Sequence, residues 1–200
     1  MERLSPGSIA SISPLVRIRL LSNLTRVFGM EFYEVIKTRR SIRSYKKTPI
    51  PEESLKRVME ATRIAPSGHN RQSWRFYVVD SEEEKEKIAE ACAGRMWITE
   101  APTVIVAVGW KFPYNRGGYM GEMTFIMDVS IAFTHLILAA RAEGLGTCWI
   151  GDFSNYKVKE ALGLPADEYV VAVTPIGYPD KGAFSENTSR KSLEEIMERV

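Results

Sequence analysis

The chain is poor in the residues that usually build metal centres and nucleophilic catalytic sites. Its 200 residues include two cysteines and two histidines. Cys92 and Cys148 lie in unrelated contexts without the paired spacing of a zinc or redox motif, and a secreted disulfide scaffold would contain more cysteine. We therefore expect no metal site, no catalytic set built on histidine, serine or cysteine, and a reducing, cytoplasmic location.

A membrane span and a strong net charge are also missing. The longest apolar run, residues 125–142, is interrupted by Asp128, His135 and Arg141 and is too polar to cross a bilayer. The net charge of +2 is too small to suggest nucleic acid or an acidic polymer as a partner. With 44% apolar and 26% charged residues, the composition is that of a soluble globular protein of one domain.

The basic excess lies at the N-terminus. Residues 1–30 hold four arginines and one glutamate, so +4 − 1 = +3, and the remaining 170 residues sum to −1. Residues 15–28 have the pattern of a basic amphipathic helix that would lie on a membrane surface or a partner. The alternative is a variable extension of little consequence. We divide the chain into residues 1–29, a basic extension that is helical or poorly ordered, and residues 30–200, one folded domain.

Helical and strand patterns alternate from Met30 onward. Ser81 with Glu84, and Ser192 with Glu195, have the spacing of a capping box, which marks a helix start. The second pair predicts a last helix near the C-terminus. Periodicity predicts further helices at 32–39, 51–65, 81–92, 122–143 and 154–162, and strands at 74–79, 103–108, 148–150 and 169–176. The fold class is therefore α+β (α/β-like).

A group of cations follows the first predicted helix, namely Arg39, Arg40 and Arg43, with the hydroxyl of Ser41 between them. Guanidinium groups bind phosphate through paired, charge-assisted hydrogen bonds, and a hydroxyl adds a neutral donor. Basic residues at a helix C-terminus also simply complement the helix dipole. Alone, the segment fits either a phosphate site or an ordinary helix end.

A polar turn joins the second helix to the first strand, in the sequence Pro66-Ser67-Gly68-His69-Asn70-Arg71-Gln72-Ser73-Trp74. Asn70 and Gln72 each offer a donor and an acceptor, which match the alternating polar edge of a planar pyrimidine-type ring. Gly68 permits close approach of the backbone. The competing interpretation is an ordinary polar turn, in which His69 faces water and Arg71 is solvated.

Two later patches complete the candidates. Gly144 and Gly146 are explained by the end of a long helix and the turn into a strand. Gly151, after the apolar Ile150, is less easily explained, and it could bring a backbone N–H against a ligand ring. Thr188-Ser189-Arg190-Lys191 precedes the last predicted helix, where cations suit a phosphate or water equally well. We expect Cys148, flanked by apolar residues, to be an inert packed thiol.

These four patches occur in the order and spacing of the nitroreductase family, which the chain resembles over residues 32–199. The resemblance implies a mixed, largely antiparallel sheet flanked by helices, in a homodimer with two FMN sites at the subunit interface. By similarity, the phosphate and ribityl end would be held by Arg39, Arg40, Ser41 and Arg190. The ring would be approached by Arg43, Ile150 and Gly151, and, from the opposite subunit, by Pro66, Ser67, Gly68, Asn70 and Gln72.

The resemblance also implies an activity: hydride passes from NADH or NADPH through flavin N5 to a nitroaromatic, quinone or similar acceptor, by a ping-pong mechanism. Arg43 would supply positive charge near N1 and C2=O, and the backbone N–H of Gly151 would face N5, so these two are the catalytic candidates. Tyr114, Tyr119 and Phe125 lie in or beside a loop that would cover the site. Other flavin chemistry on the same scaffold (dehalogenation, flavin fragmentation, enone or peptide dehydrogenation) and a non-enzymatic flavin-binding module remain as alternatives.

Overall fold

Strand β2 (Thr103–Trp110) forms the centre of the sheet, and its sequence explains this position. Val104 and Val106 belong to one hydrophobic cluster, whereas Ile105 and Ala107 belong to another. Successive side chains of a strand point to opposite faces, so a strand covered on both faces needs an apolar residue at every position. The computed structural model describes residues 30–112, 121, 123–180, 184 and 188–200.

The described sheet has four antiparallel strands in the order β1-β2-β4-β3. β1 (Trp74–Val79) and β4 (Glu168–Gly177) flank β2, and the two-residue β3 (Gly146–Thr147) pairs with the end of β4. The register of β2 against β4 shifts between Ala107 and Val108, which is a bulge. The predicted α+β class and the largely antiparallel sheet are confirmed.

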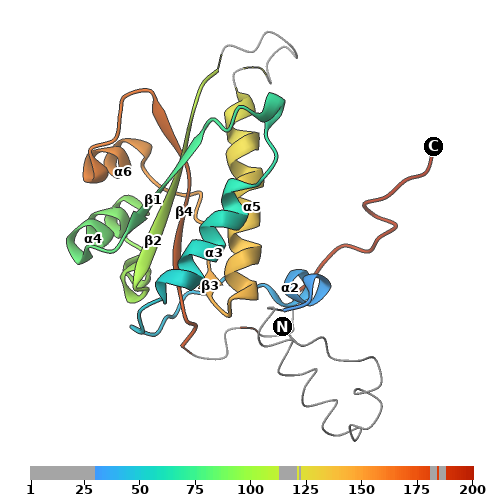
Figure 1. Ribbon diagram of the computed structural model, residues 1–200, viewed down its shortest axis with the longest axis horizontal. Helices are drawn as coiled ribbons and strands as arrows, with labels where there is room; N and C mark the ends of the chain where they lie inside the picture. Colours follow the sequence, from blue (N-terminus) through green and yellow to red (C-terminus); the bar gives the residue numbers. More distant parts are fainter. Residues whose placement is uncertain (1–29, 113–120, 122, 181–183, 185–187) are drawn as a thin grey trace, which may run out of the picture.

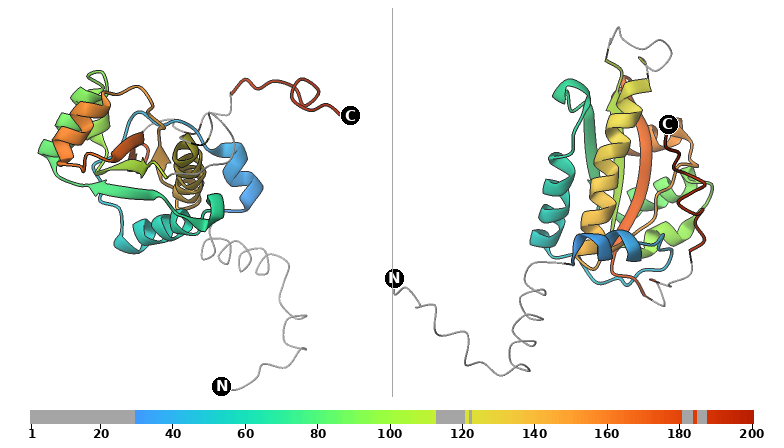
Figure 2. Two further views of the ribbon diagram at one scale, coloured as in Figure 1. Left: turned by 90° about the horizontal axis from the view of Figure 1, so that it is seen from above. Right: turned by 90° about the vertical axis from the view of Figure 1, so that its right-hand side faces the viewer.

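Helices cover both faces of this sheet, as Figure 1 shows. α3 (Glu52–Arg63) and α5 (Thr124–Ala142) lie on one face, and α4 (Glu82–Ala91) and α6 (Asn155–Leu162) lie on the other. The view from above in Figure 2 shows the same layers end on. The predicted helices at these positions are therefore confirmed, and short 3₁₀ turns at Gly68–Asn70 (η2) and Met96–Glu100 (η3) were not predicted.

The helix ends follow the sequence signals. Ser81 and Ser154 accept hydrogen bonds from the backbone N–H groups of Glu84 and Lys157, which caps α4 and α6. Gly163 ends α6 in the left-handed conformation, with φ of 60°. These local signals explain why the predicted boundaries lie close to the observed ones.

α5 is long and apolar enough, by length and composition alone, to cross a membrane, with a mean hydropathy of 1.5. In the fold it packs against α3 and against the strands β2 and β4. Val129, Phe133 and Leu136 are completely buried in the cluster between these elements. One face of α5 therefore belongs to the core, whereas Met127 and Ile131 on the helix are exposed.

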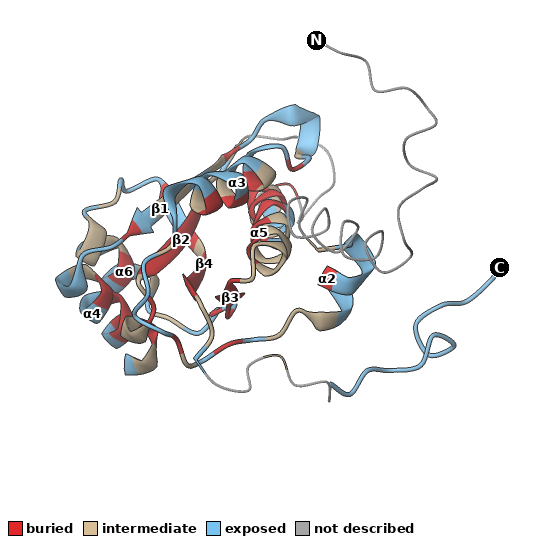
Figure 3. Cartoon of the chain, turned by 60° about the horizontal axis from the view of Figure 1, so that its bottom comes forward, coloured by how far each residue is buried: buried red, intermediate tan, exposed pale blue. Residues whose placement is uncertain are grey.

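Two predicted elements are wrong. The strand expected at 148–150 lies earlier, at Gly146–Thr147, and only an isolated bridge joins Ile150 to Val173. No helix forms after Ser192, although its backbone N–H donates to the Glu195 carboxylate at 2.8 Å as a capping box requires. Residues 188–200 are exposed along their whole length (Figure 3), so no packing surface stabilises a helix there.

Candidate functional site

The arginine-rich segment follows α2 (Phe32–Thr38) and is fixed to the sheet edge by backbone contacts. Ile42 donates its N–H to the carbonyl of Thr147 at 2.9 Å, and Ser41 forms a parallel bridge with the same residue. The buried Tyr45 hydroxyl donates to the Ile42 carbonyl at 2.7 Å. Because alternate residues of an extended segment point to opposite sides, burying Ile42 leaves Ser41 and Arg43 exposed, as observed.

Positive charge gathers around this segment. Partial burial, then the nearby Arg190 and Arg40, lower the pKa of Arg39 from its ordinary value. No carboxylate in the described part of the chain forms an ion pair with Arg39, Arg43 or Arg190. A half-buried cation beside two others is unfavourable unless an anion is nearby. The cluster therefore fits a phosphate group, and it places Arg190 near Arg39 and Arg40.

Cys148 lies against the same cluster. Its burial raises the pKa of the thiol, and this effect exceeds the opposing influence of Arg43, of a hydrogen bond to the Ser41 side chain and of Arg39. Burial likewise raises the pKa of Cys92, to about 11. Both thiols are buried and neutral at physiological pH, which is unfavourable for a nucleophile.

Arg141, in the last turn of α5, also belongs to this end of the molecule. Its Nε donates to the hydroxyl of Thr38 at 3.1 Å, and its guanidinium carbon lies 3.9 Å from the centre of the Phe184 ring. It thereby joins the C-terminal end of α2 to α5, directly before Arg39. The sequence showed Arg141 only as an interruption in an apolar run, and no motif marked its contact with Thr38.

Ile150 and Gly151 form an exposed corner after β3. Ile150 exchanges both backbone hydrogen bonds with Val173, at 2.9 and 3.1 Å, and its side chain is buried. The next residue is exposed, and a Cβ placed on Gly151 would meet no atom within 4 Å. Trp149 packs on Phe133 with ring centres 4.5 Å apart, which holds the strand in place. The backbone of Gly151 is therefore open to a planar molecule lying against it.

The predicted polar turn is present, and its backbone is strained. His69, Asn70 and Gln72 have φ values of 52°, 54° and 54°, a left-handed conformation that costs non-glycine residues about 1 kcal/mol or more each. The turn is closed by Asn70 N–H donating to Ser67 O and by Gln72 N–H donating to the Ser67 hydroxyl, at 2.9 and 3.0 Å. Strained backbone of this kind concentrates at binding sites.

The side chains of the turn leave a specific pair of groups for a ligand. Gln72 Nε2 donates to Asn70 Oδ1 at 3.2 Å and to the Asn70 carbonyl at 3.1 Å. In the described structure, Asn70 Nδ2 and Gln72 Oε1 then have no hydrogen-bond partner, and both residues are exposed. One donor and one acceptor, side by side, match the edge of a pyrimidine ring.

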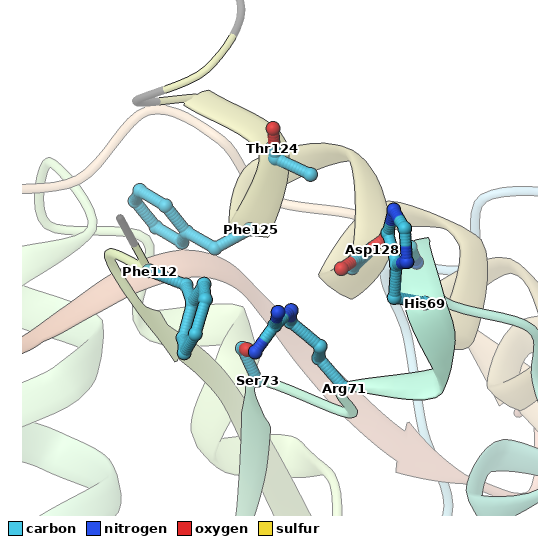
Figure 4. Close-up of a pocket in the computed structure, with 8 residues that line it drawn as sticks. His69, Arg71, Ser73, Phe112, Thr124, Phe125 and Asp128 are labelled. Carbon is cyan, nitrogen blue, oxygen red and sulfur yellow. Dashed lines mark hydrogen bonds between the residues drawn. The ribbon is translucent and has the colours of Figure 1, made fainter. Parts of the chain in front are cut away.

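A small pocket adjoins this turn at the N-terminal end of α5 (Figure 4). The guanidinium of Arg71 lies 3.5 Å from the centre of the Phe112 ring, and the buried Phe125 packs beside Tyr169. The buried carboxylate of Asp128 accepts the Gly68 N–H at 2.9 Å. Tyr114 and Tyr119 lie outside the described residues, so Phe125 is the one member of the predicted cover that the structure places.

The predicted site residues therefore form two groups on one chain. The turn from Pro66 to Gln72 is joined to Asp128, and the arginine segment is joined to Arg141 through Thr38. Asp128 and Arg141 are thirteen positions apart in α5, or about 20 Å at the usual helical rise. Within one chain, the arginine segment and the Asn70 turn are therefore anchored toward opposite ends of α5.

Among the residues that the structure describes, no group of three or more His, Cys, Asp or Glu side chains is arranged to hold a metal ion. His135 Nδ1 lies 3.1 Å from the carbonyl of Ala61, which is a packing contact between α5 and α3.

Comparison with known proteins agrees with this geometry. The model of the nitroreductase family matches residues 36–178. A protein of Thermus thermophilus named NADH dehydrogenase is 30% identical over 188 residues, covering 80% of this chain and 91% of its own. Iodotyrosine deiodinase 1 of Rattus norvegicus is 30% identical over 207 residues, covering 88% of this chain and 71% of the relative.

A solved structure extends the similarity to the fold. A protein from Exiguobacterium sibiricum 255-15, crystallised in complex with FMN, superposes with a TM-score of 0.76 at 25% identity. The match covers 86% of this chain and 98% of the other. The similarity therefore includes nearly the whole of that FMN-binding protein.

Proposed function

This chain belongs to the nitroreductase family of FMN-dependent, NAD(P)H-linked oxidoreductases, and we propose that it passes hydride from NADH or NADPH to an electron-poor acceptor such as a nitroaromatic or a quinone. The two half-reactions would occur in turn at one site, by a ping-pong mechanism. When bound, FMN supplies the two-electron carrier that the side chains lack. We place the activity in the cytoplasm, with residues 1–29 outside the catalytic domain.

The observation that supports the proposal is the half-buried Arg39 beside Arg190, neither of which forms an ion pair with a carboxylate among the described residues. Arg39, Arg40 and Arg190 would bind the FMN phosphate, with the Ser41 hydroxyl as a further donor. The charge of a phosphate compensates the mutual repulsion that contributes to the lowered pKa of Arg39. The residues present therefore fit the phosphate end of the cofactor.

The residues around Gly151 also fit the ring end of FMN. The exposed face of Gly151, where a side chain would find no neighbour within 4 Å, leaves room for a planar ring, and the backbone N–H would orient that ring. Arg43 would place its positive charge beside the pyrimidine side, where negative charge develops on reduction. Pro66, Ser67 and Gly68 would form the wall that carries Asn70 and Gln72, whose free amide donor and acceptor match the pyrimidine edge.

Two copies of the chain would complete each site. The anchors of the two groups, Asp128 and Arg141, lie about 20 Å apart along α5, so the arginine segment of one subunit would face the Asn70 turn of the other. α2 offers a surface for such pairing, because Phe32 and Tyr33 are 60% and 75% exposed. Beside them, an apolar groove runs between α2, α3 and α5, lined by Val35, Ile64, Leu138 and Ala139. A homodimer would bury these apolar surfaces.

An anaerobic titration of the purified protein with NADH and NADPH, followed by absorbance, tests the proposal. We expect the flavin band to bleach and to recover on addition of a quinone or nitroarene. The pyridine nucleotide that bleaches the band at the lower concentration identifies the preferred donor. A colourless protein that cannot be reconstituted with FMN would refute the proposal, and a flavoprotein that no NAD(P)H reduces would indicate a flavin-binding module.

The similarity to iodotyrosine deiodinase 1 favours one second candidate, reductive dehalogenation on the same scaffold. In that reaction, two electrons and a proton replace a carbon–halogen bond by a carbon–hydrogen bond and release halide. Halide release from an iodinated phenol, measured beside quinone reduction with the same reduced protein, separates the two functions. Faster turnover of the iodinated phenol would favour dehalogenation.

A further inference from the structure

We propose that Asp128 is a positioning residue for flavin binding: its buried carboxylate holds the Gly68–Gln72 turn in the conformation that presents Asn70 and Gln72 to the ring. The inference rests on the flavin site proposed above. It adds a residue of α5 that touches neither the phosphate nor the ring in that proposal, and that acts through the backbone of Gly68.

The turn needs an external anchor because its own residues disfavour its shape. His69, Asn70 and Gln72 all have positive φ, and none is a glycine. Side chains of L-residues avoid this conformation unless the surrounding structure determines it. The hydrogen bonds within the turn, such as Arg71 N–H to Gly68 O at 3.1 Å, close it locally but do not fix it to the domain.

Asp128 supplies that connection. Its Oδ1 accepts the Gly68 N–H at 2.9 Å, and the residue is only 6% exposed, on the helix that packs into the core. Figure 4 shows its carboxylate on the pocket side of α5, beside His69. Gly68 lies two residues before Asn70, so a fixed Gly68 peptide sets the start of the strained segment.

Burying the Asp128 carboxylate lowers the stability of the folded state, because few groups compensate its charge. Within the described residues, the Gly68 N–H is its one hydrogen-bond donor, and no cation forms an ion pair with it. A buried carboxylate without a cation lowers the stability of the fold, so its presence here needs another reason, which the anchoring of the turn provides. The helix dipole does not explain the residue either, because Asp128 is the fifth residue of α5 and the favourable effect is confined to the first turn.

Three substitutions separate geometry from charge. Asp128→Asn keeps an oxygen acceptor at the same place without the charge, Asp128→Ala removes the acceptor, and Asp128→Glu keeps the charge but displaces it by one methylene. Glu143→Ala is the matched control, because it removes a carboxylate from the other end of α5, where Glu143 binds Arg57 at 2.7 Å. FMN affinity would be measured by flavin fluorescence quenching, and exchange of the Gly68 amide by NMR on the FMN-free protein.

We expect Asp128→Ala and Asp128→Glu to weaken FMN binding about tenfold, the effect of losing one hydrogen bond to a charged group. Asp128→Asn should remain within about threefold of the wild type, and Glu143→Ala should be unchanged. The Gly68 amide should exchange faster in the alanine and glutamate variants than in the asparagine variant. Should the alanine variant fail to fold, FMN affinity can still be compared between the glutamate variant, which displaces the acceptor, and the asparagine variant, which keeps it.

Wild-type affinity in Asp128→Ala or Asp128→Glu would overturn the inference. So would an equal loss in Asp128→Asn, which would assign the effect to charge, or an equal loss in Glu143→Ala, which would assign it to general weakening of α5. A wild-type protein that does not bind FMN would refute the proposed function instead. In that event the exchange of the Gly68 amide still decides whether Asp128 fixes the turn.

Discussion

Ile42 and Thr147, more than a hundred positions apart in the sequence, are joined by a 2.9 Å hydrogen bond from the N–H of Ile42 to the carbonyl of Thr147. This contact places the arginine segment beside the strand that leads to Gly151. The phosphate-binding and ring-orienting residues of the proposed site are thus set by one short stretch of sheet edge.

Arg39→Ala should weaken FMN binding by about 10- to 100-fold, because it removes charge-assisted hydrogen bonds to the phosphate. Riboflavin has the same ring and no phosphate, so its affinity should change little. Titration of both ligands into the wild type and the variant measures the difference. Equal losses for the two ligands would show that Arg39 does not contact the phosphate.

Arg43→Ala should slow reduction of the bound flavin by about tenfold or more while changing FMN affinity less. The reason is that its charge is needed where negative charge develops, not at the phosphate. Stopped-flow reduction by NADH at saturating FMN gives the rate, and Arg43→Lys serves as the control that keeps the charge. Unchanged reduction kinetics in the alanine variant would remove Arg43 from its proposed role.

Arg39→Ala and Asn70→Ala subunits should complement each other when they are co-expressed. If each site takes Arg39 from one subunit and Asn70 from the other, a heterodimer has one intact site and one doubly defective site. With random pairing, about a quarter of the wild-type sites are recovered. FMN content no higher than in either variant alone would place both residues in a site within one chain.

Gly146→Ala should destabilise the fold by about 1–3 kcal/mol and weaken FMN binding. A Cβ at this position would lie 2.6 Å from Cγ1 of Ile42, so the arginine segment must move away. Combining it with Ile42→Ala should cost less than the sum of the two single changes, because the alanine removes the nearest clashing atom, Cγ1, and leaves only the Cβ of residue 42 at 2.9 Å. Additive free energies of unfolding would show that the two residues do not interact.

The contribution of Cys92 to stability should depend on pH. Burial raises its pKa to about 11 from an ordinary 9.0, so the folded state favours the neutral thiol. The corresponding stabilisation is fully present below pH 9 and is lost as the pH rises toward 11. The difference in unfolding free energy between the wild type and Cys92→Ala should therefore shrink across this range, by on the order of 1 kcal/mol after allowance for solvent screening. A constant difference would contradict the raised pKa.

Elements with strong local signals could be predicted from the sequence. β1 begins and ends at Trp74 and Val79 as expected, and Ser154 and Gly163 bound α6, because side-chain caps and left-handed glycines act over a few residues. β3 was misplaced because the apolar residues Cys148 to Ile150 suggested a strand. The pairing is instead set by Gly146 opposite Gly177, where small residues permit close packing.

The site was only partly predictable for a similar reason. The arginine segment and the Asn70 turn carry unusual polar residues that sequence reasoning can detect. Asp128 and Arg141 appear in the sequence only as polar interruptions of an apolar helix, and their contacts with Gly68 and Thr38 depend on how α5 packs. The left-handed conformation of His69, Asn70 and Gln72 could not be predicted, because no glycine stands at these positions.

The arginine segment rests on a minor core of its own, formed by the buried residues Ile42, Tyr45 and Ala101. A cluster this small contributes far less free energy than the two clusters that enclose β2. Local opening of the segment is therefore less costly than unfolding of the sheet. Opening of this small cluster alone would expose the proposed phosphate-binding residues while the rest of the domain stays folded.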